Sequence, residues 1–159
     1  ERLGYELAWR GIGLVYGGGG VGLMGVVADS VLEHGGSAVG VIPDSLMRRE
    51  FVHPALTRLE TVRDIRERKA RMEELSDAFI ALPGGIGTVE EIVEVLSAVR
   101  RGELRKPAGL LNVDGYYDGL LHFFDAVSRE GFMDGGLASV AALAAAPGEL
   151  LDRLRALSR

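Results

Sequence analysis

The chain has 159 residues and a formal net charge of −5, with 47% hydrophobic and 26% charged residues, which predicts one globular domain over residues 1–159. It has no cysteine, which excludes disulfides, thiolate metal sites and a cysteine nucleophile, and suits a reducing cytoplasm. Its apolar stretches are too short to cross a bilayer, and its acidic balance disfavours nucleic acid, because affinity for nucleic acid comes largely from clustered cations. We therefore expect a soluble cytoplasmic protein with neither a membrane nor a nucleic-acid partner.

Helical and strand patterns alternate along the chain. Helices are expected over residues 1–10, 21–34, 64–75, 88–101 and 116–130, and a last helix is expected to start at Pro147. Short apolar strands are expected over 12–16, 37–42, 78–82 and 107–113, with a further strand around 139–143. Residues 43–60 have weak periodicity and mixed charges, so we expect a surface excursion placed to cover a site. The alternation predicts an α/β, Rossmann-like fold, with a mostly parallel sheet and helices on both faces.

Glycine is unusually frequent, and nine of the 23 glycines fall in two clusters that each follow a predicted strand. Ligands of parallel α/β sheets bind beyond the carboxyl ends of the strands, where both clusters would lie. The cluster at 17–25 contains a G-x-G-x-x-G match, which is a weak signal in a glycine-rich stretch. No acidic residue follows about 20 residues later, which disfavours a standard dinucleotide site.

The second cluster lies in LPGGIGTVEE, residues 82–91, which reads as a strand, a glycine turn and a helix. The backbone N–H groups and the helix dipole would converge on an anion, and phosphate is the natural occupant. Thr88 either caps this helix or offers its hydroxyl to the anion. Glu90 and Glu91 are expected in the first turn, where acids also simply suit the dipole. The pattern alone does not decide between a phosphate site and a turn that binds nothing.

At these two clusters the sequence resembles the LOG family of cytokinin riboside 5′-monophosphate phosphoribohydrolases, long mislabelled as lysine decarboxylases. The family pattern P-G-G-x-G-T-x-x-E is met in full from Pro83 to Glu91, and the R-K pair is found at Arg68 and Lys69. The glycine element GGGxxGLMG is matched over 17–25, and KPAGLLNVDGYY, residues 106–117, is close to the family's wording. The resemblance covers nearly the whole chain.

The resemblance implies hydrolysis of the N-glycosidic bond of a cytokinin or purine nucleoside 5′-monophosphate to free base and ribose 5-phosphate. It implies no metal and no other cofactor, and a homodimer. It makes Glu91 the catalytic carboxylate, Arg68 its essential partner and the turn at 85–91 the nucleotide-binding element. The other substrate-binding positions that it implies are Gly18, Gly19, Met24, Glu50, Lys69, Gly84, Gly85, Ile86, Gly87, Thr88, Glu90 and Ser97.

The chain departs from the family pattern at a few positions. Ser97 stands where threonine is common, Gly20 replaces a residue that is often arginine, and Ile65 with Arg66 replaces the usual Met-His pair. The latter two changes are candidates for altering base preference. The family's first strand and its small-residue loop do not precede Glu1, so we expect an incomplete chain whose sheet lacks a strand and whose pocket lacks a wall.

Several alternatives stay open at this point. Taken without the resemblance, Arg68 reads better as one solvated charge in the run 63–71. The main alternative function is a non-catalytic nucleotide-binding module, or a carrier similar to molybdenum-cofactor carriers, on the same fold. Lysine decarboxylase activity is disfavoured, because Lys69 and Lys106, the only lysines, lack the context of a pyridoxal phosphate Schiff base. The histidines show no metal-ligand spacing.

The expected helix at 88–101 carries apolar residues on more than one face. A helix that is apolar over so wide an arc usually buries its second face as well. Contact with a partner subunit in a homodimer explains this pattern, and so does coverage by the C-terminal helices of the same chain.

Overall fold

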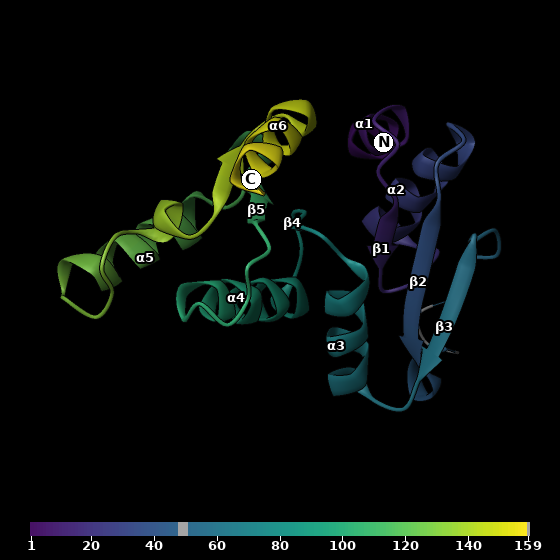
Figure 1. Ribbon diagram of the computed structural model, residues 1–159, viewed down its shortest axis with the longest axis horizontal. Helices are drawn as coiled ribbons and strands as arrows, with labels where there is room; N and C mark the ends of the chain where they lie inside the picture. The colour runs from purple at the N-terminus through teal and green to yellow at the C-terminus, as the bar shows by residue number, and fades with distance from the viewer. Residues whose placement is uncertain (48–50, 159) are drawn as a thin grey trace. The chain divides into compact units, whose positions relative to one another are not determined.

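The computed structural model describes residues 1–47 and 51–158, which fold into two compact units, Glu1–Ser76 and Asp77–Arg159 (Figure 1). Each unit contains a three-stranded sheet whose strands are all parallel and follow one another in chain order. The predicted α/β class with parallel strands is therefore confirmed. The prediction of one domain over 1–159 remains a prediction.

The first unit is built around the buried strand β2. Its elements are α1 (Arg2–Trp9), β1 (Leu14–Tyr16), α2 (Gly22–Glu33), β2 (Ala38–Pro43), the 3-10 turn η1 (Asp44–Leu46), β3 (Arg58–Val62) and α3 (Ile65–Leu75). Leu14 of β1 is paired with Ala38, and Val39 of β2 with Arg58. Gly4 lets α1 approach α2 closely, because a Cβ at this position would lie 2.6 Å from Cβ of Ser30. The helix pair and the central strand thus form the core of this unit.

The second unit carries helices on both faces of its sheet. Its elements are β4 (Phe79–Ala81), α4 (Ile86–Arg100), β5 (Ala108–Leu111), the 3-10 turn η2 (Val113–Gly115), α5 (Asp118–Arg129), the 3-10 turn η3 (Leu137–Ser139), β6 (Ala142–Ala144) and α6 (Pro147–Leu157). On β5, Leu110 packs in a cluster with Ile92 of α4, whereas Leu111 packs with Leu150 of α6. Because successive strand residues face opposite sides, α4 and α6 cover opposite faces of this sheet.

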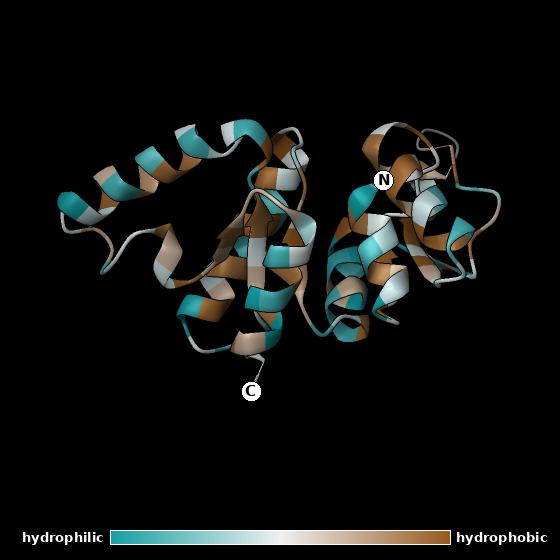
Figure 2. Ribbon diagram, turned by 90° about the horizontal axis from the view of Figure 1, so that it is seen from above, coloured by the Kyte–Doolittle hydropathy of each residue, from teal (hydrophilic) through white to brown (hydrophobic). Residues whose placement is uncertain are grey.

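Hydropathy accounts for these layers. The longest fully buried strand segments, 40–43 of β2 and 108–111 of β5, contain no polar or charged side chain. Along α5, polar and apolar residues alternate, as in an amphipathic helix (Figure 2). Among the described residues, no helix is both long enough and apolar enough to cross a membrane.

Two strand predictions need correction. β3 lies inside the segment 43–60 and beyond it to Val62, where we expected a surface excursion. Most of its side chains are exposed, and it pairs with one neighbour, β2, so its hydrophobic signal is weak. The last strand, β6, begins at Ala142 rather than near Ser139, because residues 137–139 form η3 instead.

Candidate functional site

The first glycine cluster forms a tight loop between β1 and α2, and the packing of the chain itself explains most of its glycines. Gly18 has a φ of +82°, and it lies so close to β2 that a Cβ on Gly40 would come within 2.7 Å of its Cα. A Cβ at Gly25 would lie 2.4 Å from the carbonyl oxygen of Gly20. These glycines allow backbone to approach backbone, so they do not by themselves indicate a ligand.

Arg68 lies under this loop. Its side chain is buried, with the residue 7% exposed, and its Nη2 donates a 3.0 Å hydrogen bond to the carbonyl oxygen of Gly17. Arg68 is therefore no solvated charge, and the interpretation that the sequence favours without the resemblance is wrong. Lys69, next along α3, is half-buried.

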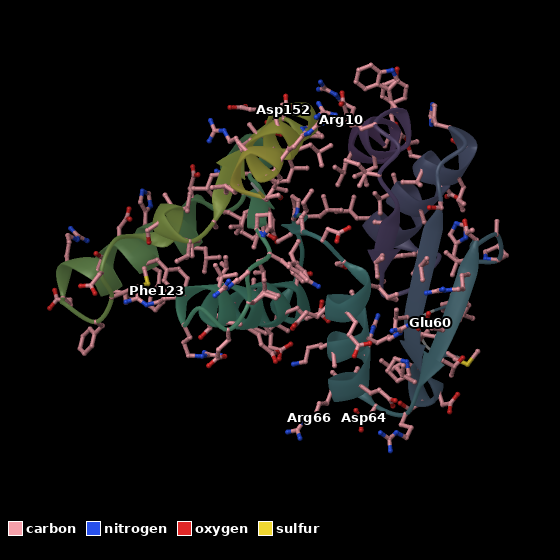
Figure 3. All side chains as sticks on the ribbon, viewed as in Figure 1. Arg10, Glu60, Asp64, Arg66, Phe123 and Asp152 are labelled. Carbon is pink, nitrogen blue, oxygen red and sulfur yellow. The ribbon has the colours of Figure 1, made fainter. Side chains whose placement is uncertain are left out.

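Ion pairs and a cap hold the helix that carries Arg68. Asp64 caps α3 by accepting a 2.8 Å hydrogen bond from the backbone N–H of Glu67. Arg71 donates two hydrogen bonds to Glu60 of β3, from Nε to Oε2 at 2.5 Å and from Nη2 to Oε1 at 3.1 Å. Figure 3 labels Glu60 on β3, and Asp64 at the start of α3. Hydrogen bonding from Arg71 is the main reason that the pKa of the Glu60 carboxyl is lowered, and the same contact raises the pKa of Arg71.

A short cross-bridge ties the glycine loop to the segment that follows the undescribed residues. The N–H of Gly20 donates to the carbonyl of Phe51 at 2.8 Å, and the N–H of His53 donates to the carbonyl of Gly18 at 2.9 Å. The His53 ring is buried, with Nδ1 accepting from the N–H of Ala55 and Nε2 lying 2.9 Å from Oδ1 of Asp29 on α2. These contacts fix the glycine loop against the segment that begins at Phe51. The predicted substrate residue Glu50 lies outside the described residues.

A tyrosine supports the same loop from beneath. The Tyr16 hydroxyl donates a 3.1 Å hydrogen bond to the carbonyl of Gly19. Burial, and after it the negative charge of Asp29, raise the pKa of Tyr16 to about 12. The hydroxyl therefore keeps its proton at neutral pH and remains a donor to the loop.

The second glycine cluster joins β4 to α4, and the helix begins earlier than expected. α4 starts at Ile86, with Gly85 as its N-cap and no side-chain cap. The predicted capping role of Thr88 is wrong, because this residue occupies the third position of the helix. Glu90 and Glu91 fall in the second turn rather than the first, since no acid lies in the first turn. The dipole effect fades beyond the first turn, so it no longer accounts for these two acids.

The glycines of this turn differ from those of the first cluster. Gly84 is needed for packing, because a Cβ there would lie 2.3 Å from Oγ1 of Thr88. Gly85 and Gly87 have no such reason: a Cβ at either would meet no described atom within 4 Å, and neither has a positive φ. Gly85 suits the N-cap, where glycine is favoured over alanine, whereas glycine at 87, inside the helix, costs stability relative to alanine. Its presence at position 87 therefore asks for another explanation.

The remaining predicted residues lie around these loops or apart from them. Glu91 and Thr88 are half-buried, and Ile86 is 86% exposed at the helix start. Met24 is exposed in the first turn of α2, close in sequence to the first loop. Ser97 is six residues from Glu91, about 240° around the helix, so the two do not share a face. The Ser97 hydroxyl accepts a 2.6 Å hydrogen bond from Nη1 of Arg101.

The predicted site residues are divided between the two units. The first unit brings Arg68 to the loop with Gly18 and Gly19, and the second joins the turn at 84–88 to Glu91. The pairing of Arg68 with Glu91 stays a prediction. Within the described parts of both units, no cluster of three or more metal-ligating side chains occurs.

Sequence reasoning missed two tyrosines that contact the second turn. Tyr116 donates to the carbonyl of Gly84 at 2.7 Å, and Tyr117 donates to the carbonyl of Leu82. The segment KPAGLLNVDGYY is close to the family's wording, but this resemblance implies no role for the two side chains. A pair of tyrosines directly after an Asp-Gly turn was the available signal.

The chain is similar to known proteins over most of its length. A family model described as possible lysine decarboxylase matches residues 24–154. The rice (Oryza sativa subsp. japonica) protein LOGL6, named a probable cytokinin riboside 5′-monophosphate phosphoribohydrolase, is 49% identical over 157 residues, which cover 99% of this chain and 63% of that protein. LOG4 of Arabidopsis thaliana, named a cytokinin riboside 5′-monophosphate phosphoribohydrolase, is 47% identical over 152 residues, which cover 96% of this chain and 71% of that protein.

Solved structures with the same fold include molybdenum-cofactor proteins. The molybdenum cofactor binding protein of Rippkaea orientalis aligns with a TM-score of 0.74 at 22% identity, covering 99% of this chain and 85% of that one. The molybdenum cofactor carrier protein of Chlamydomonas reinhardtii aligns with a TM-score of 0.72 at 22% identity, covering 98% and 83%. At this identity the likeness shows the fold alone.

The chain spans 63% of the length of each of two rice relatives, LOGL6 and LOGL2, to which it is 49% identical. The family match covers most of the chain, and the relatives match it nearly from end to end. The chain therefore belongs to the LOG family, whose family model carries the description "possible lysine decarboxylase".

Proposed function

We propose that this protein is an enzyme that hydrolyses the N-glycosidic bond of a purine or cytokinin nucleoside 5′-monophosphate, releasing the free base and ribose 5-phosphate. The relatives' names support this reaction class, since they are named cytokinin riboside 5′-monophosphate phosphoribohydrolases. One structural observation carries the proposal: Gly87, in the first turn of α4, has no side chain although a Cβ there would meet no described atom within 4 Å.

A phosphate explains that bare surface. The first N–H groups of an α-helix have no partner within the helix, and they point toward the N-terminal side with the positive end of the dipole. At α4 these groups belong to the exposed residues Gly85, Ile86 and Gly87, together with the half-buried Thr88. Glycine at 85 and 87 lets an anion reach the backbone at hydrogen-bonding distance. The 5′-phosphate of the substrate is the anion that we assign to this turn.

We assign to Glu91 the action on the ribose of a nucleotide bound in this way. It lies six residues beyond Gly85, about 9 Å along the helix axis, and helical side chains tilt back toward the N-terminus. It also shares a helix face with Gly87 and Thr88, four and three residues earlier. These helix positions support our assignment of the Glu91 carboxylate to the region next to the phosphate, where the sugar would lie.

The chemistry needs a negative charge at that place. As the bond between C1′ and the base nitrogen breaks, its electron pair leaves with the base, and positive charge develops on the ribose. A carboxylate stabilises this charge or takes a proton from the attacking water, whose oxygen forms the new bond to C1′. The proton that the water loses balances the one that the base nitrogen gains, and the sugar product is ribose 5-phosphate. We assign this carboxylate role to Glu91.

Arg68 is the second residue of the proposed site. Its buried guanidinium is anchored to Gly17, and arginine carries five N–H donors in a rigid fork that matches carboxylates and phosphates. We assign it the role of partner to Glu91, where it keeps the carboxylate ionised and contacts the nucleotide. Glu50, Lys69 and Met24 complete the proposed pocket, together with Gly18, Gly19 and Glu90.

Product identification tests the proposal. The protein is incubated with AMP and, in parallel, with isopentenyl-AMP, and the products are separated by chromatography. We expect free base and ribose 5-phosphate in equal amounts, and the ratio of kcat/KM between the two substrates gives the base preference. Binding of the nucleotide without turnover would instead identify a carrier or binding module and overturn the enzymatic assignment.

We also propose a homodimer and a cytoplasmic location. Val93 and Val95 pack partly against the hydrophobic cluster of their own unit, so the chain itself covers part of the wide apolar face of α4. Sedimentation at several concentrations tests the dimer, and a fully active monomer would overturn it.

A further inference from the structure

The segment from Asn112 to Asp118 is a turn held by several hydrogen bonds, and the proposed reaction assigns it no role. Asp114 and Gly115 are both left-handed, with φ values of 50° and 73°. Oδ1 of Asn112 accepts a 2.7 Å hydrogen bond from the N–H of Tyr117, and Nδ2 of Asn112 donates to Oδ1 of Asp118 at 2.8 Å. An aspartate in a left-handed conformation is strained, so several contacts together hold this turn in one shape.

The turn presents two tyrosines to the glycine turn before α4. Tyr117 is 2% exposed and donates to the carbonyl of Leu82, whereas Tyr116 is 54% exposed and donates to the carbonyl of Gly84 at 2.7 Å. The two rings meet edge to face, with centroids 5.2 Å apart and planes at 89°. Two successive hydroxyls thus bind two carbonyls of one short loop.

The glycine turn needs such external support. Pro83 lies between the two bonded carbonyls and has no N–H, so this residue cannot anchor the loop through a backbone donor. Gly84 has no side chain, and it is confined on its other side by Oγ1 of Thr88. The two tyrosine hydroxyls supply side-chain hydrogen bonds that fix the direction of these carbonyls.

We infer that Tyr116 is a positioning residue for the 5′-phosphate, an inference that rests on the proposed function of this turn. The peptide between Gly84 and Gly85 is trans, so its carbonyl and its N–H point in opposite directions. By holding the Gly84 carbonyl, the Tyr116 hydroxyl turns the Gly85 N–H away from itself and toward the open side of the loop. Tyr116 acts on the substrate only through this peptide.

The substitution Tyr116→Phe isolates this action, because it removes one oxygen and keeps the ring. A neutral hydrogen bond typically contributes enough to change an equilibrium by about 3- to 10-fold. We expect KM for AMP to rise about 3- to 10-fold with kcat nearly unchanged, since the phosphate is held alike in the ground state and the transition state. Dissociation constants for ribose 5-phosphate should rise by a similar factor, whereas rates with adenosine, which has no phosphate, should not change.

The control is Tyr5→Phe, a change of the same atoms on α1, which should leave KM, kcat and ribose 5-phosphate binding as in the wild type. A merely structural role for Tyr116 would lower Tm and affect AMP and adenosine alike, and that result would overturn the inference. So would unchanged KM and unchanged ribose 5-phosphate binding.

This experiment distinguishes a failure of the proposed hydrolysis from a failure of the inference about Tyr116. If wild-type protein binds ribose 5-phosphate but releases no base, the proposed reaction fails, and weaker binding to Tyr116→Phe still supports the inference. If wild-type protein releases base and Tyr116→Phe matches it in KM, only the inference fails. If wild-type protein does not bind ribose 5-phosphate, the inference is overturned together with the phosphate role of the loop.

Discussion

The guanidinium of Arg68 occupies the space that a side chain at residue 17 would fill. Nη2 of Arg68 donates to the Gly17 carbonyl at 3.0 Å, and a Cβ on residue 17 would lie 1.9 Å from that same nitrogen. The buried guanidinium therefore fits only because residue 17 has no side chain. A glycine that appears in sequence to invite a ligand instead makes room for an arginine.

The substitution Gly17→Ala should therefore lower activity in the same way as a mutation of Arg68. The methyl group displaces the end of the Arg68 side chain, and we expect kcat/KM for AMP to fall by about 10-fold or more, comparable to Arg68→Ala. Gly13→Ala is the control, because its Cβ would meet the flexible Oγ of Ser37 at 3.0 Å and the carbonyl oxygen of Ser37 at an ordinary contact distance of 3.9 Å. Wild-type activity in Gly17→Ala, measured by adenine release, would show that the position of Arg68 is not needed.

We expect glycine at position 87 to lower the stability of the protein and to favour AMP binding. Replacing glycine with alanine inside a helix typically stabilises it by about 0.5–1 kcal/mol, and position 87 has open space around the added Cβ. We expect Gly87→Ala to raise the free energy of unfolding and to weaken AMP binding by about 10-fold, because the methyl group lies where phosphate approaches. Urea unfolding and titration with AMP measure the two effects.

Gly119→Ala in α5 is the matched control for this pair of effects, because its added Cβ also meets no described atom within 4 Å. It should gain similar stability and keep full AMP affinity. Equal AMP binding by Gly87→Ala and wild type would remove the structural support for a phosphate at α4.

The contact between Glu60 and Arg71 should make both stability and activity sensitive to acid. The folded-state pKa of Glu60 is lowered, so the pair stabilises the native state above the ordinary carboxyl pKa of about 4.3, and this stabilisation is lost as pH falls through the lowered value. We expect Glu60→Gln to lower Tm at neutral pH, and the difference from wild type to shrink as the solution is acidified.

Activity measurements distinguish the contact between Glu60 and Arg71 from an ordinary surface ion pair. Glu60→Gln loosens α3, which carries Arg68, so kcat/KM should fall modestly as well. Glu149→Gln breaks an exposed pair with Arg153 on α6 and should leave activity unchanged. If both substitutions gave the same activity, the role of β3 in positioning Arg68 would be refuted.

The sequence predicted the helices and buried strands well, because their hydrophobic periodicity is strong. It missed β3, whose exposed residues on a strand paired on one side give little such signal, although Glu60 of this strand anchors α3. It also placed the start of α4 at Thr88, a common capping residue, whereas Gly85 takes the cap position. The burial of Arg68 and the contacts of Tyr116 depend on residues far away in sequence, which local patterns do not reveal.

Glu91→Gln tests the chemical role of the carboxylate. The amide keeps the shape of the side chain and removes the charge that developing positive charge on the ribose requires. We expect kcat for AMP to fall roughly 100-fold or more with nucleotide affinity and Tm retained. Glu94→Gln, one turn further along the exposed part of α4, serves as the control. Near-normal kcat in Glu91→Gln would exclude Glu91 as the catalytic carboxylate.

Recognition of a 5′-phosphate by the turn before α4 is proposed to position the ribose for hydrolysis. Its most direct test compares kcat/KM of the wild-type protein for AMP and for adenosine, with release of adenine as the common readout. The two substrates differ only in the phosphate that Gly85–Thr88 are proposed to bind. We expect AMP to be preferred by at least about 100-fold, the effect of losing roughly two charge-assisted hydrogen bonds. Equal rates for AMP and adenosine, or no release of adenine from AMP, would contradict the claim.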